Sequence, residues 1–106
     1  MPKYLFEASY TAEGAKGLLQ EGGTKRRSAV ESSLKALGAT AEAFYYALGG
    51  SDVYLIVDAP DNLTAAALSM AVNASGAVRL KTTVLLTTEE VDSAAKKAVA
   101  YRPPGK

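Results

Sequence analysis

The 106-residue chain contains no cysteine, no histidine and no tryptophan. The absence of cysteine excludes a disulfide scaffold, thiol chemistry and zinc–thiolate sites. The absence of histidine removes the one side chain whose unperturbed pKa lies near neutrality, together with the commonest metal ligand and the usual base for a serine nucleophile. Any catalysis must therefore use carboxylates, lysine, arginine or tyrosine. We expect neither a metal nor a cofactor.

An excess of charge of one sign is also lacking, because 12 basic and 11 acidic side chains give a net charge of +1. This balance argues against nucleic acid as the main partner, which usually calls for a dominant basic field. No apolar run approaches the ~20 residues that span a bilayer, and no secretory leader precedes the first strand pattern. We therefore expect no membrane partner and a cytoplasmic protein. The length indicates a single domain, at residues 1–100, with a tail at 101–106.

Alternating and helical patterns predict an order of strand, helix, strand, strand, helix, strand and one added helix. The strands are predicted at 3–10, 40–48, 52–59 and 77–86. The helices are predicted at 11–21, from Thr24 as a cap to about 37, from 61 or 62 to 75, and from a capping box at 87–90 onward. This order predicts an α+β, ferredoxin-like βαββαβ fold with a four-stranded antiparallel sheet and both main helices on one face.

The third predicted strand has two unlike faces. One face is wholly apolar and carries Val53, Leu55, Val57 and Ala59. The other carries Asp52, Tyr54, Ile56 and Asp58. Because side chains alternate across a strand, the apolar row should lie beneath the helices and the mixed row on the open face of the sheet. In such folds the open face is commonly closed by an added helix, by a ligand, or by the sheet of a second subunit.

Three segments resemble the GYD family of small proteins with dimeric α/β-barrel folds: YLFEASYTAEGAKGLL, FYYALGGSDVYLIVDAPD and LTAAALSMAVNASGAVRLKTTVLLT. The resemblance covers nearly the whole chain and implies self-association as a homodimer or a higher homo-oligomer. It implies no particular reaction. The family's glycine-tyrosine-aspartate motif falls on Gly50, Ser51 and Asp52. Ser51 stands where the motif has tyrosine, so a role that depends on a phenol is not carried over to it. The resemblance does carry over the motif roles of Gly50 and Asp52.

The open sheet face supplies the candidate ligand-binding residues, which are Glu7, Ser9, Tyr54, Asp58, Arg79 and Lys81. Glu7 is predicted to lie close to Arg79 or Lys81, because the first strand should run beside the fourth. A carboxylate and a cation that converge on a partly closed surface can orient a small polar molecule between the sheet and a partner subunit. The other interpretation is a plain ion pair at a dimer contact.

The aspartates of the third strand do not form a catalytic pair. Asp52 and Asp58 are six residues apart, nearly 20 Å at ~3.3 Å per residue, which is too far for a shared acid and base. We expect Asp52 to close the preceding turn by accepting hydrogen bonds from nearby backbone amides. Asp58 is expected to pair with a lysine or to accept a hydrogen bond from a tyrosine.

A candidate anion-binding site follows the Gly22-Gly23 pair, at Thr24, Lys25, Arg26 and Arg27. Three cations in the first turn of a helix oppose its dipole, and a phosphate or carboxylate on the free amides would reverse the sign of that effect. The alternative is that Arg26 or Arg27 reaches a neighbouring carboxylate, for example Glu21 or one on another subunit.

The second main helix carries no charged residue from 63 to 77 and is apolar all round, so it should be covered on more than one side. The added helix or a neighbouring subunit could supply that cover.

Taken together, the sequence patterns favour a non-enzymatic module that binds a small molecule or assembles with itself. The alternative is a cofactor-independent enzyme, monooxygenase-like or isomerase-like, on a small polar or aromatic substrate, which rests on fold analogy. A phosphate-ligand sensor that uses 24–27 is a third hypothesis.

Overall fold

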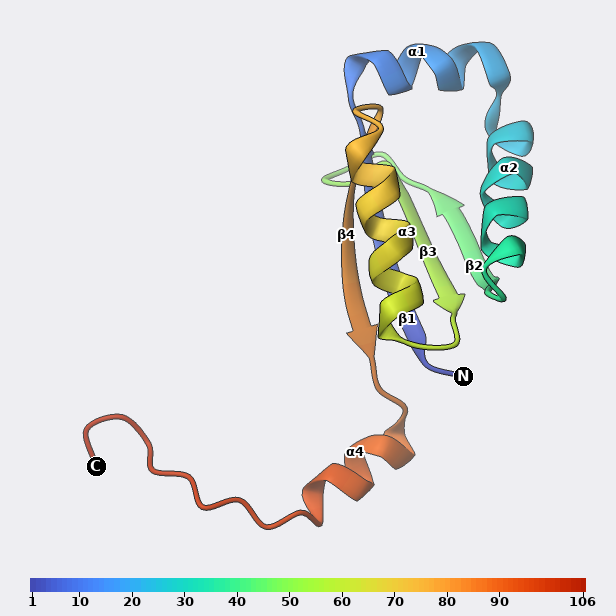
Figure 1. Cartoon of the computed structure of the whole chain (residues 1–106). Coiled ribbons are helices and arrows are strands. Elements are labelled where there is room, and N and C mark those ends of the chain that lie inside the picture. The colour runs from blue at the N-terminus through green and yellow to red at the C-terminus, as the bar shows by residue number, and fades with distance from the viewer.

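The computed structural model describes all 106 residues and contains one four-stranded sheet with helices against one face (Figure 1). The elements in chain order are β1 (Lys3–Tyr10), α1 (Ala12–Glu21), α2 (Gly23–Ala36), β2 (Thr40–Tyr46), β3 (Val53–Asp58), α3 (Asn62–Ala74), β4 (Val78–Leu85) and α4 (Thr88–Ala95). The strands are antiparallel in the order β2-β3-β1-β4. This confirms the ferredoxin-like α+β fold. β1 has its predicted bounds, and the other three strands end or begin one or two residues inside theirs.

The core lies between the sheet and the helices, and the two central strands supply most of it. Phe6 of β1 stands opposite Leu55 of β3, and Tyr4 stands opposite Val57. All four side chains are buried, which confirms the predicted apolar row, because alternate residues of a strand share one face. The complete set of buried residues is Tyr4, Phe6, Ala8, Leu34, Ala39, Phe44, Val53, Leu55, Val57, Ala59 and Ala65. Only Leu34 comes from α2 and only Ala65 from α3, so each of these helices contributes a single buried residue to the core.

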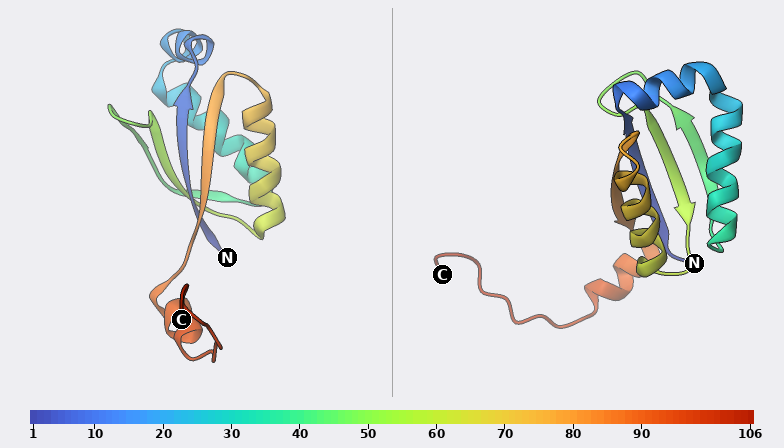
Figure 2. Two further views of the ribbon diagram at one scale, coloured as in Figure 1. Left: turned by 90° about the vertical axis from the view of Figure 1, so that its left-hand side faces the viewer. Right: turned by 45° about the horizontal axis from the view of Figure 1, so that its top comes forward.

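The turn between α1 and α2 differs from the prediction. Gly22, not Thr24, is the N-cap of α2, and it makes no side-chain capping bond. Its φ of +83° is a conformation that glycine adopts without strain. It lets α1 end and α2 begin with no linker, which places Thr24 inside the first turn. As a result α1 lies across one end of the sheet and α2 turns down along its face (Figure 2, right).

The other helix starts follow the predicted capping chemistry. The side chain of Thr11 accepts from the amide of Gly14 at the start of α1, and Asp61 accepts from Thr64 at the start of α3. Thr87 and Glu90 form the predicted capping box of α4. Side-chain oxygens at these positions satisfy amides that have no partner inside the helix.

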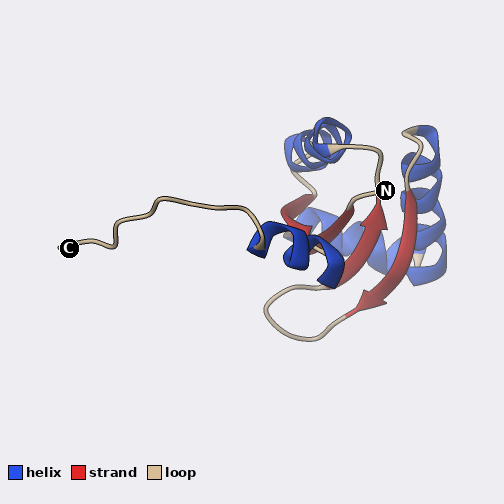
Figure 3. Ribbon diagram, turned by 90° about the horizontal axis from the view of Figure 1, so that it is seen from below, coloured by secondary structure: helices blue, strands red, loops and turns tan.

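The C-terminal arm, residues 87–106, leaves the body of the protein (Figures 1 and 3). Every residue of α4 and of the segment after it is exposed. The radius of gyration is 16.8 Å, against about 13 Å for a compact chain of this length. The chain's own α4 therefore covers neither the open face of the sheet nor α3, and it ends at Ala95.

The outer face of α3 remains bare in consequence. Leu63 and Met70 are 81% and 71% exposed. The added helix therefore does not supply the second cover expected for α3, and cover by a neighbouring subunit stays a prediction. None of the helices is both long enough and apolar enough to cross a bilayer.

Candidate functional site

The open face of the sheet brings three of the candidate ligand-binding residues into one row. The strand register places Glu7 between Tyr54 of β3 and Lys81 of β4, and it places Ser9 opposite Arg79. Tyr45 of β2 continues the row beside Tyr54. Residues paired across strands share a face and lie roughly 5 Å apart. The row therefore crosses all four strands, with a carboxylate between a phenol and an ammonium group.

Glu7 forms neither of the ion pairs that the sequence suggested. The four ion pairs in the structure are Lys3–Glu42, Lys3–Asp58, Arg26–Glu21 and Arg27–Glu31. No side-chain hydrogen bond involves Glu7, which is half-buried, while Arg79 and Lys81 are exposed. Within one chain the carboxylate of Glu7 therefore keeps its full capacity to accept hydrogen bonds.

Asp58 lies away from this row, at the other end of β3. Its carboxylate accepts a hydrogen bond from Lys3 Nζ at 2.8 Å, and the same ammonium lies 3.3 Å from Glu42. The hydrogen bond to Asp58 is the main cause that raises the pKa of Lys3. The predicted pairing with a lysine is confirmed. Since Asp58 is four positions along the strand from Tyr54, or about 13 Å, it belongs to a separate surface cluster.

Asp52, the last residue of the family motif, bonds both the turn before it and the neighbouring strand. Its Oδ2 accepts from the backbone amide of Tyr10 at 2.8 Å, and its own amide donates to the carbonyl of Ala8 at 2.8 Å. The predicted turn closure is made by the backbone carbonyl of Asp52, which accepts from the amide of Ala47 at 2.7 Å, whereas its carboxylate bonds the end of β1 and not the turn. Asp52 extends the pairing of β1 with β3 beyond its last ladder residue. Gly50 and Ser51 lie in the loop before it, and neither takes a positive φ.

The four candidate anion-binding residues do not converge. Thr24 and Lys25 are exposed. Arg26 lies 3.7 Å from Glu21, and Arg27 lies 3.6 Å from Glu31 with its guanidinium 5.5 Å from the centre of the Phe44 ring. The alternative interpretation, in which these arginines reach neighbouring carboxylates, is therefore confirmed.

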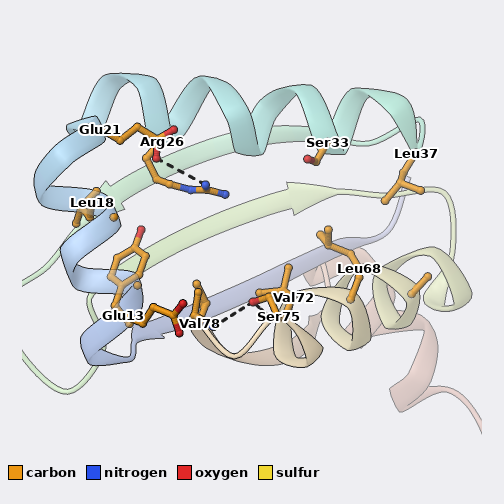
Figure 4. A pocket seen from close by; sticks show the side chains of 16 residues that line it. Glu13, Leu18, Glu21, Arg26, Ser33, Leu37, Leu68, Val72, Ser75 and Val78 are labelled. Atoms are coloured by element: carbon orange, nitrogen blue, oxygen red, sulfur yellow. Dashed lines mark hydrogen bonds and ion pairs between the residues drawn. The ribbon is translucent and has the colours of Figure 1, made fainter.

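A cleft on the helical side of the sheet was not predicted from the sequence. It has a volume of about 690 Å³ and opens between α1, α2 and α3 (Figure 4). It is lined by Tyr10, Glu13, Gly14, Gly17, Leu18, Glu21, Arg26, Ser33, Leu37, Ala67, Leu68, Ala71, Val72, Ser75, Ala77 and Val78. A smaller cavity of about 80 Å³ continues toward the sheet, where Phe6 and Leu55 form its floor. The signal in the sequence was the small side chains of its walls, Gly14, Gly17, Ala67 and Ala71, which leave space between the helices.

The end of the cleft near α1 is electrostatically distinct. Burial raises the pKa of the Tyr10 phenol, with a further contribution from Tyr46, while Arg26 acts in the opposite direction. Burial also raises the pKa of Tyr46, whose hydroxyl donates to the carbonyl of Gly23 at 2.8 Å. Arg26 thus lowers the pKa of both phenols and Glu21 raises it, in each case less than burial does.

The fold and these surfaces define a small ferredoxin-like α+β domain whose sheet is covered on one face only. The GYD domain model matches residues 4–95, from β1 to the last residue of α4. The chain belongs to the GYD domain family. No curated protein and no solved structure matches it.

Proposed function

We propose that this protein is a non-enzymatic, self-assembling GYD module that binds a small polar molecule between its sheet and that of a second copy. The observation that carries this proposal is the open sheet face, on which the unpaired carboxylate of Glu7 stands between Tyr54 and Lys81. No element of the chain lies over that row. An antiparallel sheet can keep one face in water, but this face also carries apolar side chains.

The apolar content of the face supports pairing with a second sheet. Leu5 of β1 stands opposite Ile56 of β3, and Ile56 stands opposite Ala43 of β2. Tyr45 is 71% exposed in the single chain. Aliphatic and tyrosine side chains of this kind are typical of surfaces that become buried on association. Two sheets packed face to face lie roughly 10 Å apart, which leaves the side chains of both to fill the layer between them.

The charges on the same face support a ligand within that layer. A carboxylate buried by a second sheet must be paired or hydrogen-bonded, because burying it alone is costly. Lys81 or Arg79, from either copy, can neutralise Glu7 or hold an anionic group of a ligand beside it. Tyr54 adds a hydroxyl and an aromatic ring. The site therefore suits a small polar molecule with hydrogen-bond donors and an anionic or carbonyl group.

Substitution of Tyr54 by arginine tests the assembly. We expect the wild type to have at least twice the mass of one chain by size exclusion with light scattering, and Tyr54→Arg to have the mass of one chain. The arginine would face Glu7 across the strands, and burying such an ion pair at the contact costs more than burying the phenol that it replaces. Tyr45→Arg is a second variant, and because Tyr45 is exposed in the single chain this change should not affect the folding of the monomer. Tyr101→Arg in the tail is the matched control. Circular dichroism checks that each variant is folded. A wild type that stays monomeric at all concentrations contradicts the proposal.

Substitution of Arg79 by alanine tests the ligand site separately. We expect Arg79→Ala to assemble normally and to lose the thermal shift that the wild type shows with its best compound in a metabolite screen. Dissociation into monomers would instead assign Arg79 a structural role at the contact and contradict ligand binding by this residue. Turnover of any substrate by the pure protein without an added cofactor would contradict the non-enzymatic proposal.

A further inference from the structure

The cleft on the helical side has one polar end and one apolar end (Figure 4). Its charged side chains, Glu13, Glu21 and Arg26, come from α1 and the first turn of α2. The walls farther along are mostly aliphatic, with Leu37 on the α2 side and Leu68 and Val72 on α3. A volume of about 690 Å³ falls within the roughly 300–1,000 Å³ of small-molecule sites. Such polarity suits an occupant with a charged head and an apolar body.

The hydroxyls along the helices are already engaged. Ser33 donates to the carbonyl of Ala29 at 3.2 Å. Ser75 donates to the carbonyl of Val72 at 2.7 Å and accepts from the amide of Ala77 at 3.2 Å. These groups therefore have little to offer an occupant. Hydrogen-bonding capacity that is not already used is concentrated at the end near α1.

At that end the side chains of Tyr10, Glu13 and Arg26 make no hydrogen bond within the chain. Arg26 has a single ionic neighbour, Glu21 Oε2, at 3.7 Å from its Nη1. That distance is longer than the roughly 2.7–2.9 Å of a charge-assisted hydrogen bond. A guanidinium has five N–H donors, so most of those of Arg26 remain free. The close-up places Arg26 and Glu13 on opposite sides of the cleft.

We propose that this cleft binds a small zwitterion with an apolar body, which is the chemistry of an apolar α-amino acid. The carboxylate of the ligand binds Arg26 and the hydroxyl of Tyr10. Its ammonium group binds Glu13 across the cleft. Its side chain lies along the aliphatic wall that α3 provides, against Val72 and Leu68. The site lies on the opposite face of the sheet from Glu7, so it does not rest on the proposed function.

The charges of the lining select a zwitterion over ligands with one charge. Glu21 offsets the charge of Arg26, and Glu13 is then the one acid without a counterion. A simple carboxylate would meet two acids at the polar end. A simple amine would satisfy Glu13 and leave the donors of Arg26 and Tyr10 unused. A molecule with both groups satisfies both sides of the cleft.

Three matched probes test this proposal: L-phenylalanine, N-acetyl-L-phenylalanine and L-phenylalaninamide. They share one side chain, and the second and third each lack one of the two charges. Binding to the full-length protein is measured by calorimetry and by amide chemical shifts. We expect phenylalanine to shift the amides of Gly14 and Gly17, and each blocked probe to bind about ten-fold more weakly or worse, since every 1.4 kcal/mol of lost interaction is ten-fold in affinity.

Variants of the cleft make the test specific. Arg26→Gln and Glu13→Gln are each expected to weaken phenylalanine binding about ten-fold, while Arg27→Gln, which lies outside the cleft lining, leaves it unchanged. Ala71→Phe fills the cleft from α3 without touching the polar groups and should abolish binding. Its amide spectrum shows whether the fold is kept.

Several results would overturn the proposal. They are equal affinity for the three probes, no binding of phenylalanine at millimolar concentration, or shifts confined to the strand residues around Glu7 and Tyr54. The last result would move the ligand to the open face of the sheet and so separate this inference from the proposed function. Intermolecular NOEs from Val91 to Leu68 in a mixture of labelled and unlabelled chains would instead show α4 of a second copy in the cleft, and would equally overturn it.

Discussion

Alanine at Gly14 is expected to lower the free energy of unfolding by about 3 kcal/mol, which is the upper part of the range for overpacked sites. A Cβ at this position would lie 2.0 Å from the carbonyl oxygen of Ala77 and 3.0 Å from its carbonyl carbon. Both atoms are backbone, so relief requires α1 to move away from the turn between α3 and β4. The hydroxyl and amide of Thr11 bond that same carbonyl at 3.2 and 3.0 Å, and the movement would strain both bonds.

Gly17 provides the matched control on the same helix. A Cβ there meets nothing within 4 Å. Gly17→Ala should therefore keep or raise stability by up to ~1 kcal/mol, because alanine loses less backbone entropy in a helix. Urea unfolding followed by circular dichroism measures both variants. Equal stability of the two would mean that α1 does not dock on the Ala77 carbonyl as the structure has it.

Alanine at Leu34 is expected to cost about 2–5 kcal/mol, the usual range for truncating a fully buried leucine. Leu34 is 1% exposed and is the only buried residue of α2. Its side chain packs in the cluster that contains Tyr4, Phe6 and Val57. Truncation therefore removes the main apolar contact between α2 and the sheet. It also leaves a cavity, because no other side chain of α2 is buried.

Leu19→Ala is the control for Leu34→Ala, since Leu19 is also a helical leucine and is 87% exposed. It should change stability by no more than about 0.5 kcal/mol. The same unfolding curves measure both changes. If the two leucines cost the same, α2 is not held on the sheet through Leu34.

The sheet could be predicted from the sequence because its signal is local. Strand alternation is set by backbone geometry, so the buried rows of β1 and β3 follow directly from which residues are apolar. The same alternation placed Glu7, Tyr54 and Lys81 on one face. It could not decide whether Glu7 pairs with Lys81, because that depends on the side-chain conformations of exposed residues.

The errors concern partners that are distant in sequence or backbone conformations that composition does not reveal. The carboxylate of Asp52 bonds the amide of Tyr10, 42 residues away, where only a bond to the turn was expected. Thr24 has the chemistry of a cap, but the left-handed conformation of Gly22 starts the helix earlier. The capping box of α4 predicted its first residue correctly, whereas local signals carry no information on where a helix packs.

The cleft could not be predicted for a related reason. Its volume is a property of the spacing of α1, α2 and α3, and that spacing depends on how small side chains at Gly14 and Ala71 meet their neighbours. The sequence patterns describe what a residue prefers, and they do not describe the space that a set of residues leaves. The patterns therefore assign the residues of its polar end separately, Arg26 to a candidate anion site and Tyr10 to the first strand.

The position of β1 at the centre of the sheet affects how the chain acquires its structure during synthesis. Lys3 pairs with Asp58 on one side and with Leu85 on the other. β1 is thus flanked by strands that are made after it, and the apolar side chains of Tyr4 and Phe6 stay uncovered until β3 and then β4 are made. Closing such long loops slows folding, and exposed strands of this kind are where nascent chains aggregate. The β2–β3 pair, whose strands are near neighbours in the chain, is the part of the sheet that can form first and offer β1 an edge to join.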